Sequence, residues 1–252
     1  MNLDAIVSAF PQLLAGLPTT LLLVAVAVTC GFLVAVPVAL MRLSTNPLPS
    51  GLAFAFVYVF RSTPLLVQIF LIYYGSGQFR HFFEQVGLWV LFRDAWFCAL
   101  LALALNNGAY AAEIIRGGIM SVPKGMVEAG KAVGMSGVQV FKRITFPLAL
   151  RQALPAYGNE VILMVKASSL ASTITILEIT GIAKKIIAST FRPVEVFIVA
   201  GALYLLVNFV ITRVIVLLER RLDPLHRRPK EGALLERTGA PTPATAEVKP
   251  RA

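Results

Sequence analysis

Charged residues are scarce in this sequence. Only 14% of its 252 residues are Asp, Glu, Lys or Arg, and 57% are hydrophobic, with a mean hydropathy of +0.77. A soluble domain of ordinary composition carries about 25% charged residues. The apolar residues also come in blocks of about 20, the length that a helix needs to cross a bilayer core. The composition therefore excludes an ordinary soluble domain and favours a membrane protein.

Residues that carry chemistry are equally rare. The two cysteines, Cys30 and Cys98, lie inside apolar blocks without metal-ligand spacing, and the histidines, His81 and His226, have no evident metal partner. The sequence has no glycine-rich phosphate-binding loop followed by Lys-Ser/Thr. We therefore expect no catalytic residues, no metal site and no cofactor bound by this chain, so any ATP–Mg must bind to a partner subunit.

Acidic residues are outnumbered by basic ones, which gives a net charge of +10. No interleaving of aromatic and basic residues indicates a nucleic-acid partner. The apolar blocks predict an all-α integral membrane protein, because only helices satisfy their own backbone hydrogen bonds within lipid when no strand pattern is present. The predicted spans are residues 17–40, 53–74, 95–115, 154–172 and 196–218.

The distribution of Lys and Arg predicts the orientation, because cytoplasmic loops are enriched in these residues. With the N-terminus in the periplasm and the C-terminus in the cytoplasm, most of them fall on the cytoplasmic side. A set of three in the last outer loop runs against this trend: Lys184, Lys185 and Arg192. Residues 1–222 are expected to form the transmembrane domain, and residues 223–252 a disordered basic cytoplasmic tail. The arginines around the start of this tail either contact lipid headgroups or serve only as a topology signal.

A polar loop over residues 116–150 interrupts the apolar blocks. We expect a short helix up to about Val133, a left-handed residue at Gly134, and a second helix from about Val138 that Pro147 terminates. Two short helices with a sharp bend can insert into a groove of a partner protein. The alternative from periodicity and charge is an amphipathic hairpin on the lipid headgroups.

The spacing within this loop resembles that of a known family. Glu128 and Ala129 are followed by Gly134 and, nine residues later, by Ile144 and Pro147. This resembles the cytoplasmic loop with which ABC-importer permeases bind their ATPase subunits, although Gly130 and Phe146 replace the usual Ala and Leu. The resemblance implies that five residues contact the ATPase: Glu128, Ala129, Gly134, Ile144 and Pro147. Phe141 shares an apolar face of the second predicted helix with Val138 and Ile144, so we expect it to contact the ATPase as well.

The resemblance extends over residues 10–222. Segments 60–68, 106–113, 153–164 and 191–193 are similar to polar amino-acid permeases of the histidine/octopine branch. It implies a type I ABC-importer permease of the bacterial inner membrane for polar, cationic amino acids or opines. Its partners would be two ATP-binding subunits, a second permease chain (identical or not) and a periplasmic amino-acid-binding protein.

Polar residues within the predicted spans mark candidate positions along the substrate path, because polar groups are costly in lipid. The candidates are Asn159, Glu160, Arg61 and Asn107. Glu160 either attracts a cationic solute or forms a structural pair with Arg151, Lys166 or a partner arginine. Arg61 either marks a helix break with Thr63 and Pro64 or anchors the span at the interface. Asn107 either mediates helix–helix contact or lines a cavity.

Three other functions stay open on the sequence. They are a permease for a neutral or acidic amino acid, a self-sufficient secondary transporter or channel, and a membrane scaffold or signalling protein. The second would require ion-coupling groups and more spans or an inverted repeat, which the sequence does not show.

Overall fold

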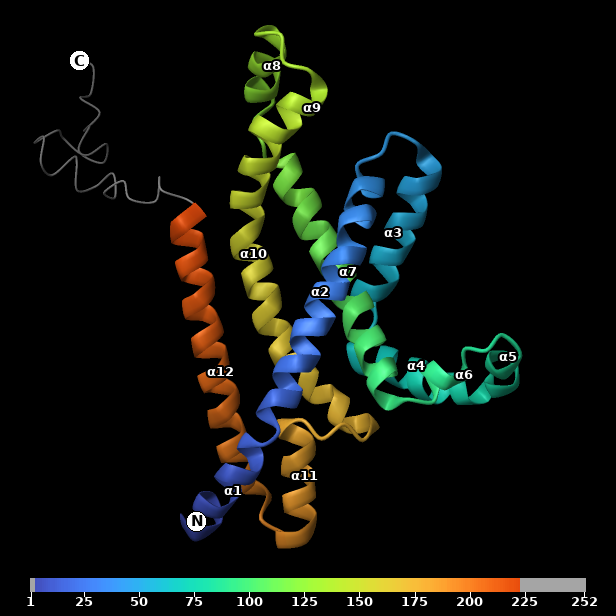
Figure 1. The fold of residues 1–252 in the computed structure, drawn as a ribbon, viewed down its shortest axis with the longest axis vertical. Helices are drawn as coiled ribbons and strands as arrows, with labels where there is room; N and C mark the ends of the chain where they lie inside the picture. Colours follow the sequence, from blue (N-terminus) through green and yellow to red (C-terminus); the bar gives the residue numbers. More distant parts are fainter. Residues whose placement is uncertain (1–2, 223–252) are drawn as a thin grey trace, which may run out of the picture.

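The computed structural model describes residues 3–222, and within that range all regular structure is helical (Figure 1). The prediction of an all-α fold is confirmed. The expected tail, residues 223–252, lies outside the described residues. The elements in chain order are α1 (Leu3–Leu14), α2 (Leu17–Arg42), α3 (Pro47–Ser62), α4 (Leu65–Gln78), α5 (Arg80–Gln85), α6 (Trp89–Phe92), α7 (Ala95–Met120), α8 (Lys124–Ala132), α9 (Gly137–Val140), a π-helical turn η1 (Phe141–Thr145), α10 (Phe146–Ala167), a 3₁₀ segment η2 (Ser168–Ile174), α11 (Ile179–Thr190) and α12 (Pro193–Leu222).

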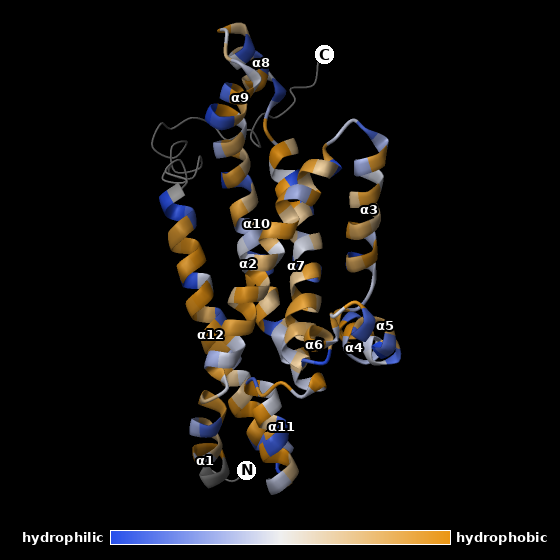
Figure 2. Cartoon of the chain, turned by 45° about the vertical axis from the view of Figure 1, so that its right-hand side comes forward, coloured by the Kyte–Doolittle hydropathy of each residue, from blue (hydrophilic) through white to orange (hydrophobic). Residues whose placement is uncertain are grey.

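Among residues 3–222, three helical stretches are long and apolar enough to cross a membrane: Ile6–Arg42, Ala95–Met120 and Pro193–Arg221. Two bent pairs also qualify, which makes five crossings if each pair crosses once. The pair α3–α4 is bent by 103°, and the pair formed by Gly137–Ile174 and α11 is bent by 47°. The apolar helices stand side by side in Figure 2.

The prediction that residues 53–74 form one continuous helical span is wrong. Thr63 and Pro64 have extended backbones between α3 and α4. A proline has no amide hydrogen and disfavours helical geometry in the residue before it, so the helix ends there. Helices α1 and α11, which the sequence analysis did not foresee, pack against the first part of α12.

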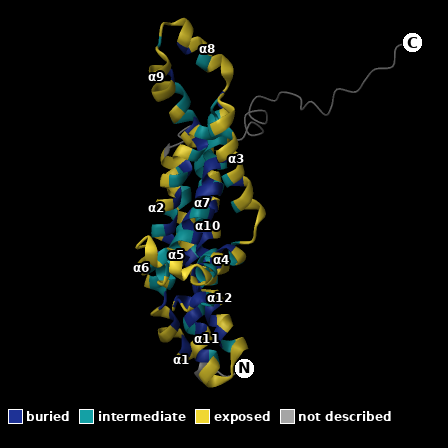
Figure 3. Ribbon diagram, turned by 90° about the vertical axis from the view of Figure 1, so that its right-hand side faces the viewer, coloured by how far each residue is buried: buried dark blue, intermediate teal, exposed yellow. Residues whose placement is uncertain are grey.

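Helix α7 lies at the centre of the molecule and is the most buried of the three long stretches (Figure 3). Small residues let α2 approach it closely. A Cβ atom at Gly31 would lie 2.4 Å from Oδ1 of Asn107, and one at Gly108 would lie 3.1 Å from Val34. Close approach through glycine is the common way in which helices pack inside membranes, where no water drives them together.

Helix α10 packs between α7 and α12 in the same manner. A Cβ atom at Gly118 would lie 2.8 Å from the carbonyl of Ala149, and one at Gly158 would lie 2.4 Å from Ile215. The glycines therefore fix α2, α7, α10 and α12 as one packed group.

The two ends of this group carry different elements (Figure 1). The α8–α9 loop, the α2–α3 turn and the last turn of α12 lie at one end, and α1 and the α11–α12 turn lie at the other. Helices α4, α5 and α6 project sideways from the group. The loop that resembles an ATPase-binding loop therefore lies far from the N-terminus.

Candidate functional site

The α8–α9 loop begins with a helix that ends in a Schellman motif. The amide of Gly134 donates to the carbonyl of Lys131 at 3.0 Å, and the amide of Met135 donates to that of Gly130 at 3.1 Å. Gly134 has a φ of +85°, which a glycine adopts without steric cost. The prediction of a left-handed residue at Gly134 is confirmed.

The second half of the loop differs from the prediction. Ser136 and Gln139 form a capping box that starts α9, but the chain then continues through η1 directly into α10. Pro147 does not terminate a helix. It is the second residue of α10, directly after the π-helical turn η1, and the helix continues through it.

A small apolar core holds the two halves together. Gly130 and Val140 are buried, and a Cβ atom at Gly130 would lie 2.7 Å from Cδ1 of Ile144. Ile144 therefore packs inside the loop, so its match to the family pattern has a structural reason. Pro147 is half-buried, as is Ile144.

The loop exposes both apolar and charged side chains. Val133, Val138 and Phe141 are 75%, 64% and 41% exposed. Glu128, Ala129 and Gly134 are also exposed, as are Lys131, Lys142 and Arg143. Large exposed apolar side chains with charged residues around them are typical of a surface that binds another protein.

The bend between α3 and α4 is held by two buried amides. Nε2 of Gln68 donates to the carbonyls of Phe60 and Thr63, at 2.9 and 3.1 Å, and to the Thr63 hydroxyl at 2.8 Å. Nδ2 of Asn106, from α7, donates to Oε1 of Gln68 at 3.0 Å and to the Phe60 carbonyl at 3.2 Å. These bonds satisfy backbone groups that the helix break frees, as a lipid environment requires.

The structure brings three of the four substrate-path candidates together. Glu160 on α10 is 5% exposed and lies beside Asn107 of α7, with Arg61 within electrostatic reach. Asn107 is fully buried, and neither atom of its amide makes a hydrogen bond of normal geometry. Asn159, the fourth candidate, is exposed on another face of α10.

The structural pairs considered for Glu160 within this chain do not form. Among the ion pairs of residues 3–222, none joins Glu160 to Arg151 or Lys166. Lys166 is exposed on the same face as Asn159, as their seven-residue spacing predicts. The helix break at Thr63 and Pro64 is confirmed, and Arg61 lies just before it.

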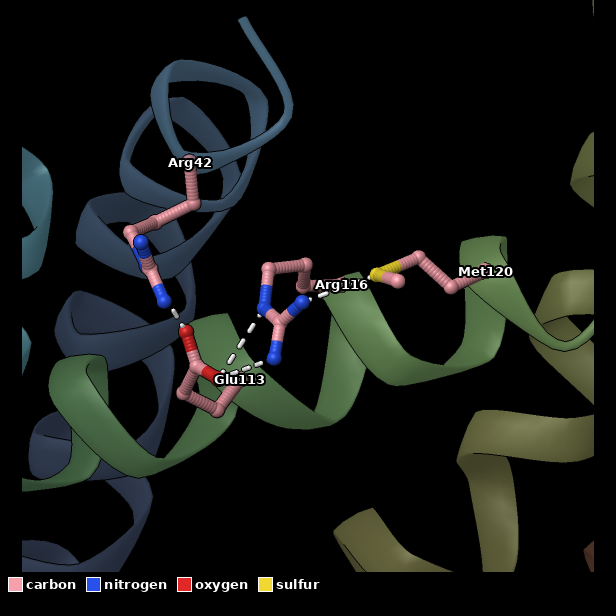
Figure 4. A network of polar contacts seen from close by, with 4 residues as sticks. All are labelled: Arg42, Glu113, Arg116 and Met120. Carbon is pink, nitrogen blue, oxygen red and sulfur yellow. Dashed lines mark hydrogen bonds and ion pairs between the residues drawn. The ribbon is translucent and has the colours of Figure 1, made fainter. Parts of the chain in front are cut away.

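A second charged cluster joins α2 to α7 near the end that carries the loop (Figure 4). Nε of Arg42 donates to Oε1 of Glu113 at 3.1 Å, and Nε and Nη2 of Arg116 donate to Oε2 at 3.0 and 2.7 Å. Nη1 of Arg116 points toward the sulfur of Met120. Both oxygens of this carboxylate are therefore occupied.

A pocket of about 350 Å³ opens beside this cluster, between α2, α3 and α7. Its lining consists of Arg42, Phe54, Val57, Tyr58, Arg61, Ser62, Tyr110 and Glu113. The guanidinium of Arg61 lies 5.0 Å above the ring of Tyr110, and that of Arg42 lies 5.0 Å above the ring of Phe54. No group of three His, Cys, Asp or Glu that could hold a metal ion occurs among residues 3–222.

Sequence reasoning missed Gln68 as a bracing residue and Glu113 as the centre of an ion cluster. Both are polar residues in apolar segments, which is the signal that identified Glu160. Their roles depend on partners 38 to 71 residues away, and only the fold brings these together.

The sequence matches the family of binding-protein-dependent transport system inner membrane components over residues 27–224. It is 60% identical to the nopaline transport system permease protein of Agrobacterium fabrum, over 92% of this chain and 96% of that protein. It is 53% identical to the octopine transport system permease protein of Rhizobium radiobacter, over 86% and 89%. An arginine ABC transporter permease of Escherichia coli is 38% identical over 86% and 97%.

The fold agrees with these matches. An amino acid ABC transporter chain of known crystal structure superposes with a TM-score of 0.78 at 35% identity, over 88% of this chain and 99% of that one. The methionine ABC transporter MetNI, at 20% identity and a TM-score of 0.69 over 84% and 96%, shares the fold. The chain therefore belongs to the inner membrane components of binding-protein-dependent transport systems, as a permease subunit with a type I ABC-importer fold.

Proposed function

We propose that this chain is the permease subunit of an ATP-driven importer for arginine-type cationic amino acids or opines. We infer the class of solute from the similarity to permeases named for nopaline, octopine and arginine, which extends over nearly their full length. A buried carboxylate between α7 and α10, Glu160, supports a cationic solute, since an ionisable residue inside a membrane span usually has a functional partner.

The α8–α9 loop is the surface to which an ATPase subunit binds. Its apolar tip enters a groove of the ATPase, and Glu128 at its edge orients the contact with a basic residue. An exposed ion pair contributes only about 0–1 kcal/mol, so the affinity comes mainly from Val133, Val138 and Phe141. ATP–Mg binds to the two ATPase subunits, and the loop lies in the cytoplasm with the C-terminus.

A second permease chain covers one face of α10. Five exposed residues at spacings of three and four form this face: Gln152, Ala156, Asn159, Leu163 and Lys166. An amide and an ammonium group on the outside of a membrane helix require a partner helix or a wet cavity. Asn159 therefore lines the solute path between two permease chains, while Asn107, Glu160 and Arg61 line it from within this chain.

The periplasmic binding protein delivers the solute at the opposite end, where the N-terminus and α11 lie. The basic residues that oppose the orientation rule, Lys184, Lys185 and Arg192, are exposed there. An acidic face on the binding protein would attract these residues. Such a contact would explain why basic residues lie on the periplasmic side, against the orientation rule.

Transport by the reconstituted complex tests this function. The permease, its ATPase and its binding protein are placed in liposomes, and uptake of nopaline, octopine, arginine, glutamine and glutamate is measured with and without ATP. We expect ATP-dependent uptake of the first three solutes. Uptake of glutamine or glutamate alone indicates a neutral or acidic amino-acid permease, and uptake without the ATPase indicates a secondary transporter.

The role of Glu160 is tested in the same vesicles with Glu160→Gln. We expect uptake of arginine to fall much further than residual uptake of glutamine, because the amide keeps the size of the side chain and removes its charge. An equal fall for both solutes contradicts a charge-reading role.

A further inference from the structure

The lining of the pocket between α2, α3 and α7 carries a net positive charge. Two of its eight lining residues are arginines, and one is a carboxylate. That carboxylate, Glu113, already binds Arg42 with one oxygen and Arg116 with the other. None of the ion pairs among residues 3–222 joins Glu113 to Arg61.

Arg61 has a defined orientation although it forms no ion pair among residues 3–222. Its guanidinium lies 5.0 Å above the Tyr110 ring, so one face is covered and the edge with its donors remains available. Arg61 is exposed in the last turn of α3, so these donors are accessible to a ligand. A stacked guanidinium in an open pocket is thus prepared for an anionic ligand.

The pocket adjoins the candidate substrate path. Arg61 stacks on Tyr110 of α7, three residues from Asn107, and Glu160 lies beside Asn107, so the guanidinium and the acidic group are neighbours along α7. A solute with both a cationic group and a carboxylate matches this pair of charges. The volume of about 350 Å³ falls in the range of about 300–1,000 Å³ that small-molecule sites occupy.

We propose that this pocket is the subsite for a carboxylate of the transported solute, with Arg61 as the residue that binds it. The proposal rests on the proposed function, because it assumes a guanidino amino acid or opine as solute. A guanidinium binds a carboxylate with two parallel hydrogen bonds, which makes it selective for that group. Nopaline and octopine are arginine derivatives with an additional carboxylate, so an anion-binding subsite favours them.

The proposal is tested by measuring binding after removal of the solute's carboxylate, of the guanidinium of Arg61, or of both. The purified permease–ATPase complex, in nanodiscs of phosphatidylcholine and without binding protein, is assayed for equilibrium binding of radiolabelled arginine. Agmatine, which is arginine without its carboxylate, and nopaline serve as competitors. The variants are Arg61→Gln and the matched control Arg80→Gln, whose arginine also stacks on an aromatic ring, Trp89, but lies on α5.

The wild-type complex is expected to bind agmatine roughly 10- to 100-fold more weakly than arginine, the range that a hydrogen-bonded charge contributes. Arg61→Gln should weaken arginine binding by the same factor and leave agmatine binding within about twofold. Retained agmatine binding also shows that the variant is folded. Arg80→Gln should change neither.

Three results overturn the proposal. One is equal affinity of the wild-type complex for arginine and agmatine, and another is a parallel loss of both solutes in Arg61→Gln. The third is that Arg61→Gln binds arginine as tightly as the wild-type complex but retains less phosphatidylglycerol when this lipid is added to the nanodiscs. That result would mean that the pocket holds a lipid headgroup. If the complete system does not import arginine or nopaline at all, the proposed function fails instead.

Discussion

The two amides that brace the α3–α4 bend provide the most direct test of how this fold is stabilised. Gln68 and Asn106 are 6% and 7% exposed, and together they make five hydrogen bonds, four of which involve Gln68. Replacing Gln68 with Leu keeps a side chain of similar size and removes all four. The Thr63 carbonyl then loses the acceptor bond from Gln68, and Asn106 loses one partner.

The magnitude follows from the number of bonds. Side-chain hydrogen bonds within membrane proteins contribute about 0.6 kcal/mol each. The two hydrogens of the Gln68 amide supply two full bonds shared among its three acceptors, and the bond accepted from Asn106 is the third, so the loss is about 1.8 kcal/mol. Asn106→Leu removes two bonds and should cost about 1.2 kcal/mol on the same scale. The double variant should cost less than the sum of the two, because the Gln68–Asn106 bond is lost in both single variants.

The free energy of unfolding can be measured by titrating the protein in mixed micelles with sodium dodecyl sulfate. Gln85→Leu, an exposed amide on the neighbouring helix α5, is the control and should change the free energy by less than about 0.5 kcal/mol, as surface substitutions usually do. If Gln68→Leu is as stable as this control, or if the two single effects add fully, the amides do not act as one brace.

Three further predictions concern glycines. Gly134→Ala should reduce co-purification of the ATPase subunit, because an alanine at a left-handed φ costs about 1 kcal/mol, whereas Gly137→Ala, in open space at an ordinary φ, should not. Gly31→Ala should lower the thermal stability of the purified protein, since its Cβ atom would overlap α7, and Gly51→Ala, with no neighbour within 4 Å, should leave it unchanged. Gly130→Ala should be tolerated in both assays, because only the flexible end of a neighbouring side chain must move; a loss as large as that of Gly31→Ala would contradict this packing.

Features that depend on local sequence were accessible before the structure. Gly134 is predicted to be left-handed because a glycine follows a short helix, and a helix break at Thr63 and Pro64 is one of the two interpretations of Arg61, because a proline fixes its own backbone and restricts its neighbour. These effects act within a few residues, so the sequence contains their cause. The same holds for the all-α class, which follows from apolar blocks of membrane length.

Features that depend on distant partners were not accessible. The break at Pro64 was expected at the start of a span, whereas it divides one, and the bend of 103° is stable because Asn106 reaches it from α7. Glu160 was recognised as costly in a membrane, but its neighbours Asn107 and Arg61 come from other helices. Periodicity within one segment does not say which helices meet.

The continuity of the helix at Pro147 affects how movement of the α8–α9 loop is transmitted to the membrane helices. Because the chain passes from α9 through η1 into α10 without a loop, the part of the proposed ATPase-binding surface on α9 and η1, with Val138 and Phe141, forms one continuous helical rod with the helix that carries Glu160 and Asn159. On the other side, the non-helical residues 121–123 separate α8 from α7. A displacement of the loop by an ATPase would therefore pass to α10 more directly than to α7. Since Asn107 and Arg61 are not on α10, such a displacement would change their distances to Glu160, and with them the affinity for a solute held between these groups.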